Sequence, residues 1–188
     1  MTDIIAAIDT LQQARAIVET QRYIDQASRL FQQNFPAIEV LFDLKGRAAG
    51  MYRVRRCGSR RQRQIRYNPW LFAKYWNDNF GNTIPHEVAH YIADLVYGAD
   101  NIRPHGEEWK AIMGHFGATP NIRADYDLTG TPQRRNRYYR YRCRCGEVKL
   151  TAYRHNRIVR GQRRYFCRDC RQPLRMIPAT TVEPKKRS

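Results

Sequence analysis

The sequence lacks an apolar run long enough to cross a lipid bilayer, and it is poor in acidic residues. Its 188 residues include 17 aspartates and glutamates against 34 lysines and arginines, which gives a net charge of +17 at pH 7. The N-terminal residues Met1-Thr2-Asp3-Ile4 have neither a basic start nor a signal-type apolar stretch. These absences argue against a membrane protein and against export, so we expect a cytoplasmic location.

The excess of positive charge favours a polyanionic partner, either nucleic acid or an acidic membrane surface. Residues 53–66 hold seven arginines and no acidic residue, and residues 131–175 hold 15 basic and 2 acidic residues, a net of +13. In the second stretch tyrosines alternate with arginines. The tyrosines either fill a small core or stack on unpaired bases. We expect binding to DNA, with single strands or junctions preferred if Tyr138, Tyr141 or Tyr165 stack on bases.

Cysteine is sparse, and its placement is uneven. Cys57 stands alone, whereas the other four cysteines form two pairs late in the chain. Without an export signal, such pairs favour metal ligation over disulfides. About forty residues with few large aliphatic side chains need an ion to fold, so one structural Zn²⁺ is expected here. Its candidate ligands are Cys143, Cys145, Cys167 and Cys170, with His155 as a replacement for Cys143 or Cys145.

The most informative stretch is His86-Glu87-Val88-Ala89-His90, a His-Glu-x-x-His pattern. Apolar residues continue past it at helical spacing, and Pro85 precedes it, so a helix over 84–97 is expected with Thr83 as its cap. A chance match would usually lie in a strand, a loop or a polar helix face. Two histidines four residues apart share one helix face and can bind one metal ion. Glu87 can then take a proton from a metal-bound water, which is the chemistry of a zinc peptidase.

A catalytic zinc usually has three protein ligands and a water, so a third ligand must follow the motif. The preferred candidate is His105, because Pro104 and the acidic pair after it predict a new helix whose entry can face the metal. The other candidates are Asp94, Asp100, Glu107, Glu108 and His115, of which His115 is expected to be a surface or core histidine.

The chain is expected to form two domains and a tail. An α+β domain, residues 1–130, would place the metal on helices packed under a small antiparallel sheet. Residues 131–178 would form a zinc-ribbon-like basic subdomain of short strands, one of them at Ile158-Val159, and 179–188 would be disordered. Before residue 118, helices are expected at 4–33, 69–76, 84–97 and 106–116, and strands at 38–44, 49–56 and 62–67.

Several motifs lie in order along the chain, at residues 65–69, 86–90, 105–109, 141–146, 154–157 and 165–170. Together they resemble the SprT family, the bacterial relatives of the Spartan protease. The resemblance implies a small zincin-like metalloprotease with His86, His90 and His105 on zinc, Glu87 as the base and a zinc-ribbon-like tail. It also suggests proteins bound or crosslinked to DNA as substrates. The likeness covers most of the chain.

The sequence therefore predicts a zinc metallopeptidase that acts on or near DNA, with one catalytic and one structural Zn²⁺. The alternative is a nucleic-acid-binding protein whose peptidase-like domain is a scaffold with weak or no turnover. The intact Glu87 argues against that alternative. A tyrosine or an arginine near the cleft would serve to stabilise the oxyanion.

Overall fold

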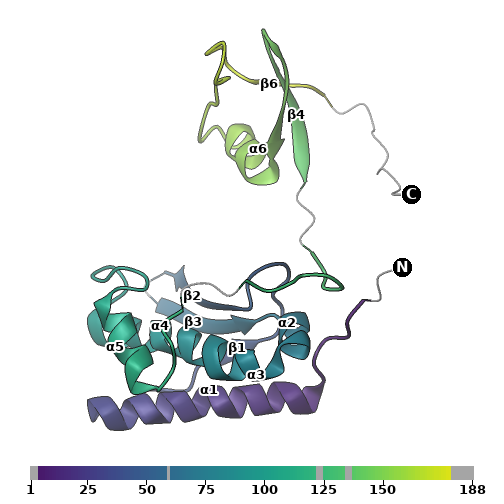
Figure 1. Cartoon of the computed structure of the whole chain (residues 1–188). Coiled ribbons are helices and arrows are strands. Elements are labelled where there is room, and N and C mark those ends of the chain that lie inside the picture. Colours follow the sequence, from purple (N-terminus) through teal and green to yellow (C-terminus); the bar gives the residue numbers. More distant parts are fainter. Residues whose placement is uncertain (1–3, 59, 122–124, 134–136, 179–188) are drawn as a thin grey trace. The chain divides into compact units, whose positions relative to one another are not determined.

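The computed structural model describes residues 4–58, 60–121, 125–133 and 137–178. The chain divides into two compact units, residues 1–134 and 135–188, which we describe separately (Figure 1). The predicted disordered tail, 179–188, lies outside the described residues. None of the described helices is both long enough and apolar enough to span a membrane.

The first unit begins with the long helix α1, Thr10–Phe31. The predicted start at residue 4 is too early, because Asp9 sets the helix start. Its carboxylate accepts the N–H of Gln12 at 2.7 Å, and the Gln12 side chain accepts the N–H of Asp9 at 3.1 Å. This reciprocal capping box fixes the first turn, and Gln32, in the left-handed conformation, ends the helix before Pro36 is reached.

The sheet of the first unit contains β1 (Glu39–Leu41), β2 (Gly50–Cys57) and β3 (Arg60–Tyr67) in the order β1-β3-β2. Strands β2 and β3 form an antiparallel hairpin, whereas β1 runs parallel to β3. The predicted small antiparallel sheet is therefore right for β2 and β3 and wrong for β1. Strand β3 lies between β1 and β2 in the sheet. The neighbour of β1 is therefore β3, the second strand after it in the chain, and these two strands run in the same direction. This order leaves β2 as an edge strand.

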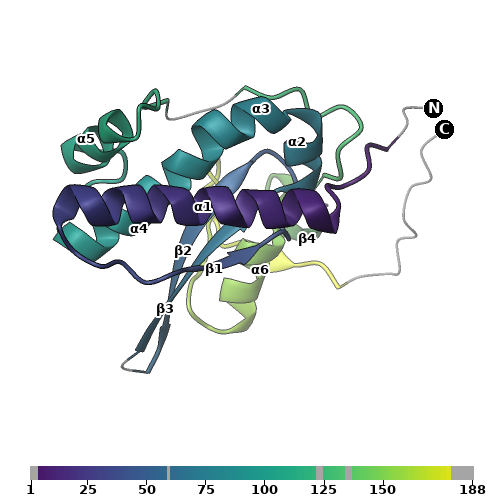
Figure 2. The ribbon, with the colours of Figure 1, turned by 90° about the horizontal axis from the view of Figure 1, so that it is seen from below.

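Helices α1 and α4 (Ile84–Tyr97) lie against the same face of this sheet (Figures 1 and 2). The hydroxyl groups of Thr20 in α1 and Tyr67 in β3 hydrogen-bond at 2.9 Å across the core. Thr83 does not cap α4 as predicted. The helix continues directly from a π-helical turn, and the Thr83 hydroxyl donates to Oδ1 of Asn79. The helices after β3 are α2 (Pro69–Lys74), α3 (Trp76–Asp78), the π turn η1 (Asn79–Thr83), α4 (Ile84–Tyr97) and α5 (Glu107–His115).

The second unit contains the strands β4 (Tyr138–Cys143), β5 (Gly146–Thr151) and β6 (Arg175–Met176) and the helix α6 (Ala152–Val159). The strands form a small antiparallel sheet in the order β5-β4-β6. Ile158-Val159 lie in that helix and not in a strand as predicted, because two apolar residues are too few to distinguish the two structures. Both units mix helices with a small sheet, so the expected α+β class is confirmed.

Candidate metal centres

Three imidazoles from two segments meet in the first unit. His86 and His90 lie one turn apart on α4, and His105 comes from the loop before α5, where its backbone has a positive φ of 59°. The Nε2 atom of His90 lies 3.2 Å from that of His86 and 3.1 Å from that of His105, and the His86–His105 separation is also 3.1 Å. The three nitrogens converge on one point, so they can hold one metal ion.

All three imidazoles are neutral near pH 7. Burial lowers the pKa of His86 to about 4 and that of His90 to about 3, and the neighbouring imidazoles act in the same direction. Burial also lowers the pKa of His105. The neutral ring is the form that binds a metal, because its unprotonated nitrogen has a free lone pair.

Main-chain and ring contacts orient these imidazoles. Nδ1 of His86 lies 3.2 Å from the carbonyl oxygen of Asn121. A carbonyl oxygen only accepts hydrogen bonds, so Nδ1 carries the proton and Nε2 is left free to face the other two histidines. The buried Trp109 of α5 closes one side, with its ring centroid 4.8 Å from those of His86 and His105 and 5.6 Å from that of His90.

Glu87 lies beside this cluster, and its side chain is 94 % buried. Burial raises its pKa to about 8, while the main-chain N–H of Tyr52, which donates to Oε2 at 2.6 Å, acts in the opposite direction. Gly50 allows the edge strand to come this close. A Cβ at position 50 would lie 2.6 Å from Cγ and 2.7 Å from Oε1 of Glu87.

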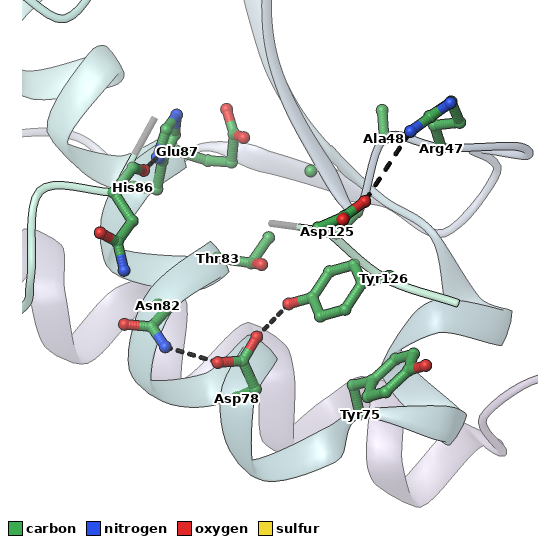
Figure 3. A pocket seen from close by; sticks show the side chains of 13 residues that line it. Arg47, Ala48, Tyr75, Asp78, Asn82, Thr83, His86, Glu87, Asp125 and Tyr126 are labelled. Carbon is green, nitrogen blue, oxygen red and sulfur yellow. Dashed lines mark hydrogen bonds and ion pairs between the residues drawn. The ribbon is translucent and has the colours of Figure 1, made fainter. Parts of the chain in front are cut away.

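A cavity of about 890 Å³ opens next to His86 and Glu87 (Figure 3). Its opposite side carries Tyr126, whose ring stacks on that of Tyr75 with centroids 4.6 Å apart. The Tyr126 hydroxyl donates to Asp78, and Figure 3 shows both groups on the far side of the cavity from the histidine. The cavity is large enough to admit a peptide segment next to Glu87.

The other candidates for a third ligand make different contacts. Asp94 and Asp100 accept from arginines of the β2–β3 hairpin, and Glu107 pairs with Lys110 at 2.9 Å. His115 is exposed at the end of α5. Of the sequence candidates, the structure brings only the loop histidine to the two on α4.

Four thiols meet in the second unit. Strand β4 ends at Cys143 and β5 begins at Gly146, so Cys145 lies in a two-residue turn, which accounts for the tight spacing of the first pair. Its Sγ atom lies 3.5 Å from that of Cys143 and 3.6 Å from that of Cys167. With Cys170 they form a group whose sulfur atoms all lie within 4.8 Å, consistent with a zinc ribbon.

His155 does not join the cysteines. Its ring stacks on that of Tyr139 with centroids 3.6 Å apart, and its Nδ1 lies 3.0 Å from the hydroxyl of Tyr141. The fully buried Tyr141 is a core residue, so the expectation that it could stack on a base is wrong, whereas Tyr138 is 56 % exposed. The four cysteines therefore make up the group without a histidine.

Residues 20–129 match the SprT-like family. The chain belongs to the SprT-like family. It is 36% identical over 152 residues to Protein SprT of Vibrio parahaemolyticus, covering 80% of this chain and 86% of that protein. It is 38% identical over 161 residues to Protein SprT of Pseudomonas putida strain W619, covering 84% and 92%. No solved structure was found to match the chain.

The SprT-like region contains the three histidines and Glu87, whereas the four cysteines follow it. Sequence reasoning missed the roles of Trp109, Asn121 and Gly50 around this SprT-like site. Trp109 belongs to the segment starting at His105 that carried the family resemblance. This resemblance is the one signal in the sequence that could have identified Trp109. Asn121 contributes only its main chain, so no side-chain pattern marks it.

The positive charge of this SprT-like chain is unequally divided. Residues 1–134 hold 17 basic and 14 acidic residues, a net of +3, whereas residues 135–188 hold 17 basic and 3 acidic residues, a net of +14. Four of the seven arginines in 53–66 also form ion pairs within the first unit, at 2.7–3.2 Å. These pairs are Arg56–Asp100, Arg61–Asp100, Arg63–Asp94 and Arg66–Asp43.

Proposed function

We propose that the chain is a cytoplasmic zinc metalloprotease of the zincin type that acts on or near DNA, on proteins bound or crosslinked to it. The observation that carries the proteolytic part is the convergence of three Nε2 atoms beside Glu87 at an open cavity. Membership of the SprT-like family, whose domain is metalloprotease-like, supports it.

The donor set fits zinc. Two nitrogens that bind one tetrahedral zinc at about 2.0–2.1 Å lie about 3.3 Å apart, and the imidazole nitrogens here are 3.1–3.2 Å apart. All three donors are neutral nitrogens on one side of the site, which leaves room for water and substrate on the cavity side. His86, His90 and His105 would hold the ion.

A zinc ion bound there would acidify a water and polarise the scissile carbonyl. Glu87 would accept the proton of the attacking water at Oε1, because Oε2 takes the N–H of Tyr52. It would then pass the proton to the leaving nitrogen. Tyr126 and Arg47, which both line the cavity, are the residues of suitable type to contact the substrate oxygens.

The four cysteines fit a structural zinc. Sulfur ligands of one tetrahedral zinc at about 2.3 Å lie about 3.8 Å apart, close to the 3.5 Å and 3.6 Å found here. The hydrogen bond between Cys145 and Cys170 lowers the pKa of Cys170 and raises the pKa of Cys145, so one thiolate of the pair is favoured before a metal binds. Four thiols without a disulfide suit a reducing compartment.

The net charge of +14 on residues 135–188 supports the DNA part of the proposal. Arg154, Arg157 and Arg160 follow one another at three-residue spacing in and just after α6, so they share one side. Tyr138 and Tyr153 are 56 % and 67 % exposed and can stack on unpaired bases.

Proteolysis is tested by incubating the zinc-loaded chain with an unstructured protein such as casein. We expect fragments from the wild type and none from Glu87→Gln, whereas Glu107→Gln, which changes an exposed carboxylate on α5, should cleave normally. Absence of cleavage by the wild type, with and without single-stranded DNA, would favour the binding-scaffold alternative.

DNA binding is tested by titrations at several salt concentrations. Replacing Arg157, Arg163 and Arg164 with glutamine should reduce the slope of log K against log salt by about 0.7 per lost single-strand contact. A matched control removes the same charge from the first unit by changing Arg15, Arg22 and Arg29. Equal weakening by both triple variants would show that the binding is not confined to residues 135–188.

A further inference from the structure

Tyr52 contacts helix α4 at two points. Its main-chain N–H donates to Oε2 of Glu87, and its hydroxyl donates to Oδ2 of Asp94, each at 2.6 Å. Glu87 and Asp94 are seven residues apart, so they share one face of α4 and are separated by about 10 Å along its axis. One residue of β2 thus spans two turns of the helix that carries the histidines.

Burial and several hydrogen bonds fix the carboxylate of Asp94 in place. Its side chain is 2 % exposed, and the same Oδ2 atom accepts Nε of Arg63 at 2.7 Å while Oδ1 accepts the N–H of Ala99 at 3.0 Å. Burial raises the pKa of Asp94, but the hydrogen bonds from Tyr52, Arg63 and Ala99 outweigh it, so the carboxylate stays charged. A buried charged acceptor with three donors is a fixed anchor.

Strand β2 needs such an anchor because it is an edge strand with only β3 beside it in the sheet. No other hydrogen bond between the described side chains of β2 and α4 joins the strand to the helix. Gly50 lies so close to Glu87 that a small shift of β2 changes the space around the carboxylate. The position of β2 therefore determines where Oε1 points.

We infer that Tyr52 is a positioning residue, whose hydroxyl bond to Asp94 holds its own main-chain N–H against Glu87 and so aims the free carboxylate oxygen at the cavity. This inference rests on the proposed proteolytic role of Glu87. Proton transfer requires the base within about 2.6–3.2 Å of its target. A misplacement of about 1 Å can cost about 100-fold in rate.

The test compares Tyr52→Phe, Asp94→Asn and the double variant as zinc-loaded full-length chains. Each single change should lower kcat about tenfold or more, with KM within about twofold and unchanged zinc content. The double variant should lose no more activity than the more impaired single variant. Tyr52→Phe removes the hydroxyl donor and Asp94→Asn weakens its charged acceptor, so both changes act on one hydrogen bond. The matched control is Tyr91→Phe, which removes a hydroxyl on α4 that donates to the carbonyl of Pro36.

A second measurement does not depend on turnover. The amide proton of Tyr52, bonded to a carboxylate, should resonate far downfield in the wild type. It should move upfield in Tyr52→Phe and Asp94→Asn, and stay in place in the Tyr91→Phe control. If the wild type cleaves nothing, the proposed function fails, and the amide shift still decides the inference.

Three results would overturn the inference. Tyr52→Phe could keep the wild-type kcat, or it could lose no more kcat than the Tyr91→Phe control. The losses of kcat in the two single variants could also add in the double variant. An unmoved Tyr52 amide proton in Asp94→Asn would do the same. Reduced kcat with a shifted amide proton, unchanged KM and non-additive losses would establish it.

Discussion

The indole Nε1–H of Trp109 donates to the carbonyl oxygen of His86, 3.2 Å away. The same indole ring packs against all three imidazoles, so a single residue of α5 contacts every proposed metal ligand of the first unit. Helix α5 thus orients the histidines although it supplies none of them.

Trp109→Phe should weaken metal binding by the histidine cluster about 10- to 100-fold, because it removes this bond and part of the ring contact. Competition with a chelator of known affinity measures the change. The control is Trp76→Phe, which alters a tryptophan whose ring packs at a tilt against that of Phe80. Equal affinities of wild type and Trp109→Phe would show that the indole does not orient the ligands.

His105→Ala should lower the metal content from two ions per chain to one. It removes one of three nitrogens that lie 3.1–3.2 Å apart, and the four cysteines are untouched. Elemental analysis of the purified protein gives the number. His115→Ala changes an exposed histidine and should keep both ions. An unchanged count in His105→Ala would remove it from the ligand set.

Gly50→Ala should abolish most activity without loss of metal. The new Cβ would lie 2.6 Å from Cγ of Glu87 and 2.8 Å from Cγ2 of Thr83, so the carboxylate or the strand must move. Such overpacking costs about 1–3 kcal/mol of the free energy of unfolding. Gly114→Ala meets no atom within 4 Å in α5 and should instead stabilise the chain by about 0.5–1 kcal/mol. Denaturation and casein cleavage of both variants distinguish the cases.

Cys167→Ser should unfold residues 138–176 while the first unit stays folded. Cys167 is the most buried of the four thiols, and a zinc that loses one of four sulfurs supplies less folding free energy. Amide hydrogen exchange followed along the chain measures both units in one experiment. Full protection of β4 and β5 in the variant would mean that the unit folds without its metal.

Asp94→Asn should make the free energy of unfolding depend less on pH in the acidic range. The pKa of Asp94 is lowered in the folded state, below the unfolded value of about 3.9, so its ionisation stabilises folding above that value. This contribution is complete at neutral pH and is lost as the pH falls through the folded-state pKa. The free energy of unfolding of the variant should be about 1–3 kcal/mol lower at pH 7, with a smaller difference below pH ~4. Urea unfolding at several pH values measures it, and a difference that stays constant would show that the charge contributes nothing.

Local spacing was enough to predict the pair on α4, because two histidines four residues apart share a face wherever the helix packs. His105 was predictable from the helix start that follows it. The contacts that hold Glu87 were not predictable. One is a main-chain N–H of Tyr52, 35 positions away, and the other is the close approach allowed by the missing Cβ of Gly50. The parallel pairing of β1 and the burial of Tyr141 depend in the same way on which segments meet in space.

The unequal charge of the two units has a consequence for how targets would be chosen. A unit of net charge +3 that carries Glu87 has little electrostatic attraction of its own to a polyanion, but it is covalently joined to one of +14. Once the second unit is bound, the first is present at a high local concentration around that point, whatever its own affinity. Cleavage would then be governed by where a protein is located rather than by a recognition sequence within it.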